Sequence, residues 1–274
     1  MTAWQPCESS IDEILSRFPQ PLMALARGEI PAFIFRRAYD PAHCAGLMAR
    51  FAERGLLQLA STGIDSRSPY VNIGTSFGMH HKDREAFFAH AARTRELFST
   101  LFKGYDDPVR TMYDLLAALA PDKQVKTAYE PDDSIYGPAI FRIYHSETGH
   151  GPHFDSVRKR TRALDYQITR FEYQFAAVLC LQNARADEPG GEPFLYNCSW
   201  SPEVQEHLDN NTFDAYTAAQ NIERLQVQLE PGDLYFFFTE NIHEVPLVQG
   251  EIQRGVLAIF FAMSADDEEI FVWA

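Results

Sequence analysis

The hydrophobic period of the chain changes near residue 122, and this change constrains the fold more than any other feature. Before it, apolar residues recur at helical spacing and predict helices over 41–54, 82–103 and 108–119. After it, short apolar runs alternate with turn residues, a pattern that is typical of a double-sheet jelly roll. The strands expected in this second part span 125–129, 138–145, 151–157, 171–181, 193–199, 225–229, 233–238, 242–248 and 253–263.

The first part of the chain carries helix-start signals. Ser10 with Glu13 forms a capping box, and Asp40, followed by a proline, supplies an N-cap and a preorganised first helical residue. Two expected strands, 32–37 and 70–77, interrupt the helices. Helices therefore dominate this part without filling it.

The second part is punctuated by explicit turns at 188–191 and 230–233, where proline and glycine separate apolar runs. One helix is expected among its strands, over 202–220. The sequence therefore predicts an α+β fold with a mainly β core, a cupin-like double-stranded β-helix. We expect the whole chain to form one domain, in which 1–122 is mainly helical support and 123–274 is the jelly roll.

Charge excludes several classes of partner. The chain has 274 residues, with Lys+Arg 24 against Asp+Glu 38 and a formal net charge of −14. Such a surface repels nucleic-acid phosphates and anionic lipids, so we expect neither nucleic acid nor membrane as a partner. No apolar stretch approaches the roughly 18 residues that a membrane-spanning helix needs, and the 4 cysteines are widely spaced. The expected location is the cytoplasm, with reduced thiols.

The pattern His-x-Asp occurs three times, and its context separates the three copies. Two copies, 81–83 and 207–209, fall at a helix start and within a helix, where they read as surface residues. The third, His153 with Asp155, falls in an expected strand, where residues two apart point to the same face. His243 lies about 90 residues later in another expected strand and supplies a third ligand. Two imidazoles and one carboxylate on one side of iron leave positions open for a co-substrate and O₂.

Arg254 stands shortly after His243, at the start of a strongly apolar strand. A guanidinium at that depth requires an anion, because an unpaired buried charge is very costly. A carboxylate fits, since arginine binds it through two parallel hydrogen bonds.

Together, His153, Asp155, His243 and Arg254 resemble the site of the Fe(II)- and 2-oxoglutarate-dependent oxygenases. The turns at 188–192 and 231–234 resemble turns of the same superfamily. Over about 70–274 the layout is most similar to the carrier-independent halogenases of indole-alkaloid biosynthesis and their hydroxylase relatives. The features that support this narrower likeness are the segment Trp200-Ser201-Pro202 and the C-terminal strand ending in Phe271-Val272-Trp273.

The resemblance implies an enzyme that uses Fe(II), 2-oxoglutarate and O₂ and releases succinate and CO₂. It implies that Arg254 holds the distal carboxylate of 2-oxoglutarate and that the substrate is a free small molecule, an amino-acid derivative or a secondary metabolite. The halogenases replace the carboxylate ligand with Gly or Ala to admit chloride, whereas this chain keeps Asp155, so hydroxylation is favoured. The chain also departs from many members of the superfamily in having Val256 where they have Ser.

Secondary candidates surround this set. Tyr144 and Arg142 share one face of the strand before the metal motif and are candidates for hydrogen bonds to the co-substrate. The segment 156–170 is rich in basic residues and reads either as a lid for an acidic substrate or as an exposed loop. Apolar residues near the site read either as pocket walls or as core. The candidate substrate contacts are Ile73, Phe77, Phe154 and Arg158.

Several alternatives stay open at the level of sequence. The same scaffold supports a desaturase, a cyclase or a halogenase. A non-catalytic, cupin-like metal-binding protein is a different class, against which Arg254 argues, since such a barrel has no need of that arginine. The sequence decides neither the substrate and the position of attack nor the choice between a monomer and a homodimer.

Overall fold

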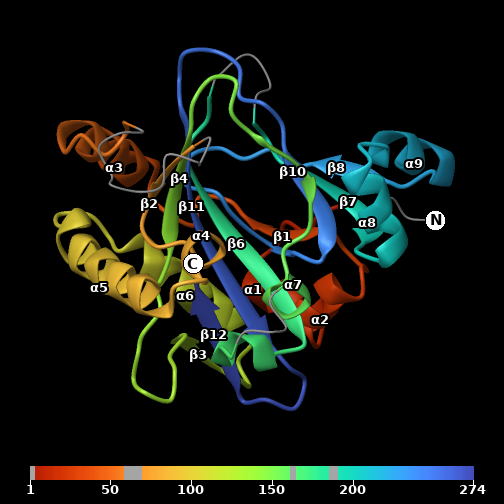
Figure 1. Cartoon of the computed structure of the whole chain (residues 1–274), viewed down its shortest axis with the longest axis horizontal. Helices are drawn as coiled ribbons and strands as arrows, with labels where there is room; N and C mark the ends of the chain where they lie inside the picture. Colours follow the sequence, from red (N-terminus) through yellow and green to blue (C-terminus); the bar gives the residue numbers. More distant parts are fainter. Residues whose placement is uncertain (1–3, 59–69, 161–164, 185–190) are drawn as a thin grey trace.

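The computed structural model describes residues 4–58, 70–160, 165–184 and 191–274. Two sheets form its β core (Figure 1). The larger sheet has the order β1-β9-β6-β11-β12-β3, and β4 pairs with both β11 and β2. Its strands are β1 Ala32–Phe35, β2 Val71–Ile73, β3 Gln124–Thr127, β4 Ile140–Tyr144, β6 Tyr173–Gln182, β9 Leu234–Phe238, β11 Arg254–Met263 and β12 Glu269–Trp273.

The smaller sheet has the order β5-β10-β7-β8. Its strands are β5 His150–His153, β7 Phe194–Ser199, β8 Arg224–Gln226 and β10 Asn241–Val245. Leu195 of β7 packs in one apolar cluster with Ala176 of β6 and Tyr235 of β9, so the two sheets face each other across a shared interior. The double-sheet jelly roll expected from the sequence is confirmed.

The side chains of strand β11 show that the two faces of the larger sheet have different surroundings. Leu257, Ile259 and Phe261 are buried in the main apolar cluster together with helical residues of the first part of the chain. Because successive side chains alternate, Val256 and Phe260 point the other way, toward the smaller sheet. One face of the sheet therefore builds the core, and the other face lines the jelly-roll interior.

Helices of the first part supply the other half of that core (Figure 1). They are α1 Ile11–Arg17, α2 Pro21–Ala26, α3 Pro41–Glu53, α5 Arg84–Leu101 and α6 Pro108–Leu119, whereas the short α4 Phe77–His80 packs Phe77 in a separate cluster. The expected capping box is present, with the Ser10 side chain accepting from the backbone N–H of Glu13, and the Asp40 side chain caps α3. These local signals were sufficient to place the helix starts.

Three expected elements differ from the structure. The helix expected over 202–220 is two helices, α8 Pro202–Asp209 and α9 Phe213–Gln220, separated where Asn211 adopts a left-handed φ of 55°. The strand expected over 70–77 is only β2, and Phe77 begins α4. The strand expected over 151–157 ends at His153, and helix α7 Val157–Arg160 follows because the Ser156 hydroxyl accepts a hydrogen bond from the Lys159 backbone. A short 3₁₀ helix, Gln167–Arg170, comes next.

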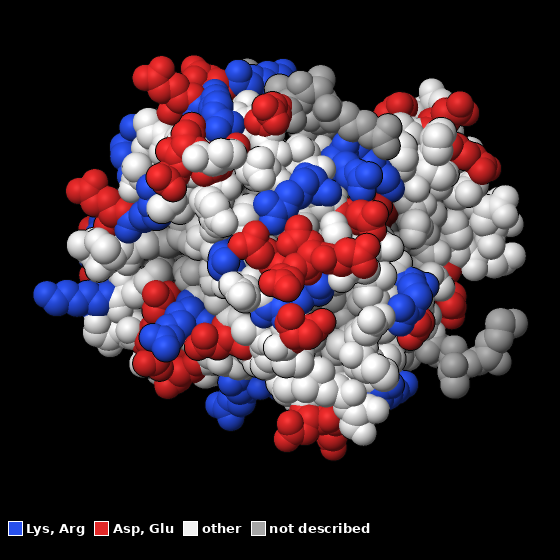
Figure 2. All heavy atoms as spheres, turned by 90° about the horizontal axis from the view of Figure 1, so that it is seen from below, with Lys and Arg blue, Asp and Glu red and all other residues white. Residues whose placement is uncertain are grey.

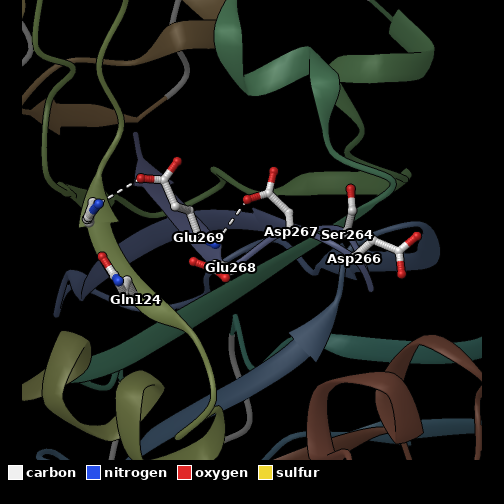
Figure 3. A pocket seen from close by; sticks show the side chains of 7 residues that line it. Gln124, Ser264, Asp266, Asp267, Glu268 and Glu269 are labelled. Atoms are coloured by element: carbon white, nitrogen blue, oxygen red, sulfur yellow. Dashed lines mark hydrogen bonds and ion pairs between the residues drawn. The ribbon is translucent and has the colours of Figure 1, made fainter.

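Acidic and basic side chains are interspersed over the face that Figure 2 shows, with a group of acidic ones near its centre. A hollow at the β11–β12 turn is lined by Asp266, Asp267, Glu268 and Glu269 (Figure 3). Lys126 lies 2.7 Å from Glu269, and Arg170 contacts both Asp267 and Glu269. Two of the four carboxylates, Asp267 and Glu269, are therefore paired with neighbouring cations. Within the described ranges, no helix is long and apolar enough to cross a membrane.

Candidate metal centre

Three potential metal ligands converge between the two sheets. His153 ends β5 and His243 lies opposite it on β10, while Asp155 follows two residues after His153. One ligand atom from each of the three residues lies within 4.8 Å of the others. The Oδ2 atom of Asp155 lies 3.7 Å from His153 Nε2 and 3.5 Å from His243 Nε2. The pattern read from the sequence thus forms one compact cluster.

Backbone hydrogen bonds fix both imidazole rings in the orientation that a metal requires. The Nδ1 atom of His153 lies 2.7 Å from the carbonyl of Gly151, and that of His243 lies 2.9 Å from the carbonyl of Asn241. A carbonyl oxygen only accepts, so each Nδ1 carries the proton and donates it. Each Nε2 therefore presents a lone pair toward Asp155, which is the arrangement found in metal-ligating histidines.

Hydrogen bonds to the backbone of Asp155 hold it in place, and neighbouring groups favour the ionised form of its carboxyl group. Its N–H donates to the carbonyl of Thr239, whose hydroxyl donates back to the carbonyl of Asp155. Burial by itself would raise the pKa of Asp155, but the two imidazoles, in the state in which their Nε2 atoms carry a proton, and the charge of Arg160 bring that pKa well below its usual range. Asp155 is therefore an anionic ligand at neutral pH.

A third imidazole, which no pattern in the sequence singles out, lies against the cluster. The ring of His150 is centred 3.6 Å from that of His153. Residues three apart on a regular strand point to opposite faces, but the β5–β10 register shifts between His243 and Val245. This irregularity brings the two rings together, and the spacing in the sequence does not reveal it. Burial, followed by the charge of His243, lowers the pKa of His153 well below its usual value.

Arg254 and the three potential ligands line one cavity. The two sheets enclose this space, which has a volume of about 60 Å³ and is lined by Arg142, Tyr144 and Arg254 as well as the three ligands. Arg254 is 4% exposed and its guanidinium carbon lies 5.4 Å from the centre of the Tyr144 ring. In the described part of the chain, no carboxylate forms an ion pair with Arg254, so its charge is available to a bound anion.

Gly191 makes room for that arginine. It has a φ of +81°, and a Cβ atom added there would lie 2.8 Å from Arg254 Cδ and 2.7 Å from Val248 Cγ2. Any side chain at this position would therefore displace the guanidinium stem. The turn expected at 188–191 lies otherwise outside the described residues.

Arg142 is a second guanidinium in the same interior. It lies on β4 two residues before Tyr144 and therefore on the same face, as expected. Its guanidinium carbon lies 5.8 Å from the centre of the Tyr70 ring and 5.9 Å from that of Phe260. The buried Nε atom of Arg142 has no hydrogen-bond partner among the described residues, so it can still donate to a ligand.

Asp155 also lines a second hollow, of about 200 Å³. Phe77 lines it as expected, together with Phe260 and Trp273. The other candidate substrate contacts lie elsewhere. Ile73 packs in the main core, Phe154 stacks on Trp200 in a separate cluster with ring centres 5.0 Å apart, and Arg158 is exposed on α7.

The basic segment 156–170 makes specific contacts in its described portions. Lys159 lies 2.6 Å from Glu240, and its ammonium group lies 4.9 Å from the centre of the Trp200 ring. Arg160 lines the second hollow and lies 3.8 Å from Asp155 Oδ1. Residues 161–164 lie outside the described ranges, so the lid hypothesis stays a prediction.

The donor set fits a divalent iron ion. Two imidazole Nε2 atoms and one carboxylate oxygen approach from one side, and this combination is the facial triad of non-haem Fe(II) oxygenases. Arg254 lines the same cavity as the triad, so a carboxylate bound there would meet its guanidinium.

Comparisons with known proteins agree with this geometry. A family model described as "Carrier-protein-independent halogenase WelO5" matches residues 8–274, a longer stretch than the 70–274 expected. An N-substituted L-amino acid dioxygenase from Burkholderia ambifaria is similar in fold, with a TM-score of 0.58 and 16% identity over 92% of this chain and 90% of its own. HygX from Streptomyces hygroscopicus, solved with nickel and 2-oxoglutarate, has a TM-score of 0.51 and 11% identity over 95% and 90%. No curated protein matches the chain.

Proposed function

Because the chain belongs to the carrier-protein-independent halogenase family, within the Fe(II)- and 2-oxoglutarate-dependent oxygenases, we propose that it hydroxylates an unactivated C–H bond of a free small molecule. In this proposal His153, Asp155 and His243 hold Fe(II). Arg254 holds the distal carboxylate of 2-oxoglutarate, and Tyr144 and Arg142 line the co-substrate cavity beside it.

The observation that carries the choice of hydroxylation is the carboxylate of Asp155. In the halogenases that the sequence resembles, Gly or Ala stands at this position and leaves room for chloride. Here the Oδ2 atom of Asp155 lies close to both Nε2 atoms and completes the ligand face. A halide therefore has no vacant ligand position on that face.

The residues of the site divide the work of the reaction. Bound iron with 2-oxoglutarate and O₂ supplies the oxidation of the C–H bond, with release of succinate and CO₂. The backbone carbonyls of Gly151 and Asn241 keep both imidazoles oriented as ligands. Arg254 orients the co-substrate, and the apolar walls, such as Val256, limit the access of water.

The family match itself favours a second candidate, halogenation, since the family is described by that activity. The two activities give different products from the same substrate and the same co-substrate. A hydroxylase adds one oxygen atom, whereas a halogenase replaces one hydrogen with chlorine. A desaturase or cyclase would instead remove two hydrogens.

The first experiment tests the metal and co-substrate without a substrate. Fe(II) and 2-oxoglutarate added in the absence of O₂ should give the visible charge-transfer band of a chelated iron complex, and the variant His243→Ala should not give it. A wild-type protein without the band would refute the oxygenase assignment.

The second experiment identifies the reaction. The protein is incubated with Fe(II), 2-oxoglutarate, O₂ and chloride, and a panel of small molecules is screened for substrate-triggered succinate. The panel begins with N-substituted amino acids, because a dioxygenase of similar fold is named for them. Mass spectrometry of the product should show an added oxygen, and a chlorinated product would overturn hydroxylation.

A further inference from the structure

Arg160 occupies a distinctive place beside the second hollow. It lies on α7, five residues after Asp155, and lines the hollow together with Phe77, Phe260 and Trp273. Its guanidinium carbon lies 4.6 Å from the centre of the Phe154 ring, which supports it from behind. Its side chain is 47% exposed, so a molecule that enters the hollow meets it at the rim.

The other basic residues of α7 are placed differently. The ammonium group of Lys159 is bound to Glu240 at 2.6 Å, and Arg158 is exposed without lining the hollow. The ion-pair partner of Arg160 is Asp155, whose Oδ1 atom lies 3.8 Å from the guanidinium, beyond hydrogen-bond distance. Of the described basic residues on this helix, Arg160 is therefore the one that lines the hollow and whose guanidinium N–H groups are largely available for hydrogen bonds to a ligand.

A charge count at the loaded site points to an anion, and this step rests on the proposed function. Among the described residues that line the two spaces, Asp155 is the only carboxylate, whereas Arg142, Arg160 and Arg254 are all cationic. The two charges of Fe(II) are cancelled by the two carboxylates of 2-oxoglutarate, and Asp155 cancels one arginine. Two positive charges then remain uncompensated in a partly buried space, which favours a further anion.

We propose that the substrate is a small carboxylic acid with an aromatic or bulky apolar body, and that Arg160 binds its carboxylate. The body lies in the hollow against Phe77, Phe260 and Trp273, next to the ligand Asp155. Arg160 suits this role because its planar group binds a carboxylate through two parallel hydrogen bonds. The positive charge of Arg160 thus favours a substrate with a carboxylate, and the aromatic walls of the hollow favour a substrate with a bulky apolar body.

The test compares acids with uncharged amides of the same shape. Indole-3-acetate is paired with indole-3-acetamide, and phenylacetate with phenylacetamide. Binding is measured by calorimetry and by the shift of the charge-transfer band, without O₂, at Fe(II) and 2-oxoglutarate concentrations that saturate the band in each variant. In the wild-type protein at least one acid should bind about 10-fold or more tightly than its amide, the worth of a charge-assisted hydrogen bond.

Three variants locate the effect. Arg160→Gln should abolish the preference for the acid, and Arg160→Lys should retain part of it. Arg158→Gln removes an equal charge from the same helix away from the hollow and should keep the preference. The proposal is overturned if no acid binds more tightly than its amide, or if Arg160→Gln keeps the preference. Failure of the proposed function is seen separately, because the band is then missing before any probe is added.

Discussion

Replacement of Arg254 by glutamine should weaken the binding of 2-oxoglutarate far more than that of the metal. Arg254 is 4% exposed, so a carboxylate bound there is removed from water and depends on the guanidinium for its hydrogen bonds. Loss of one partner of such a buried charge pair costs about 2 to 5 kcal/mol. The dissociation constant should therefore rise about 30-fold to about 4,000-fold.

The assay is an anaerobic titration of 2-oxoglutarate into the Fe(II)-loaded protein, followed by the charge-transfer band. Arg254→Lys keeps the charge without the planar fork and should fall between the wild type and Arg254→Gln. Arg224→Gln is the matched control, since Arg224 is exposed on β8 and contacts Phe194 rather than the cavity. Affinity of Arg254→Gln within about threefold of the wild type would refute the assigned role, because even the low end of the expected loss is tenfold larger.

Three further predictions follow from the same geometry. Asp155→Gly should abolish most hydroxylation and lower the affinity for Fe(II), measured by metal titration; undiminished hydroxylation would show that Asp155 is not a ligand. Gly191→Ala should lower the free energy of unfolding by about 2 to 4 kcal/mol, from left-handed strain and overpacking, and should also weaken 2-oxoglutarate binding, since the new Cβ atom meets Arg254. Burial, followed by the charges of His80 and Arg93, lowers the pKa of His90 to about 4. As pH falls, His90 of the unfolded chain binds a proton before His90 of the folded protein does, so the free energy of unfolding decreases between about pH 6.5 and about pH 4. Chemical denaturation over this range should show that His90→Gln loses about 1 to 2 kcal/mol less of its free energy of unfolding than the wild type does. Equal losses would contradict the assignment.

The metal triad could be predicted from the His-x-Asp spacing together with a distant histidine, and not from apolar alternation, since β5 reads only His-Gly-Pro-His. The register between β5 and β10 then places His153 and His243 opposite each other. Arg254 could also be singled out from the sequence, because a charged residue at the start of an apolar strand needs an oppositely charged partner. The helix starts at Ser10 and Asp40 followed from capping chemistry alone.

Other features depend on irregular backbone that no periodic pattern encodes. His150 joins the site through a register shift, and Asp155 lies beyond the end of its strand. Arg158 was one of the candidate substrate contacts; the change from strand to helix before Val157 places Arg160, and not Arg158, in the lining of the hollow beside Asp155. Ile73 shares a face of β2 with Val71, and both side chains pack in the main core. The position of Ile73 in the sequence, close to Phe77, therefore did not predict that its side chain lines the pocket.

The position of Asp155 ties the choice of reaction to the choice of substrate. It lines both the cavity that contains Arg254 and the hollow beside Arg160, so in the proposed function it would stand between co-substrate and substrate. A glycine there would open a ligand position and would also remove the only carboxylate among the described residues that line the two spaces. The three arginines would then favour any small anion, chloride included, by charge alone. In the proposed function, the same aspartate would therefore keep a halide from the iron while Arg160 binds the carboxylate of an acidic substrate.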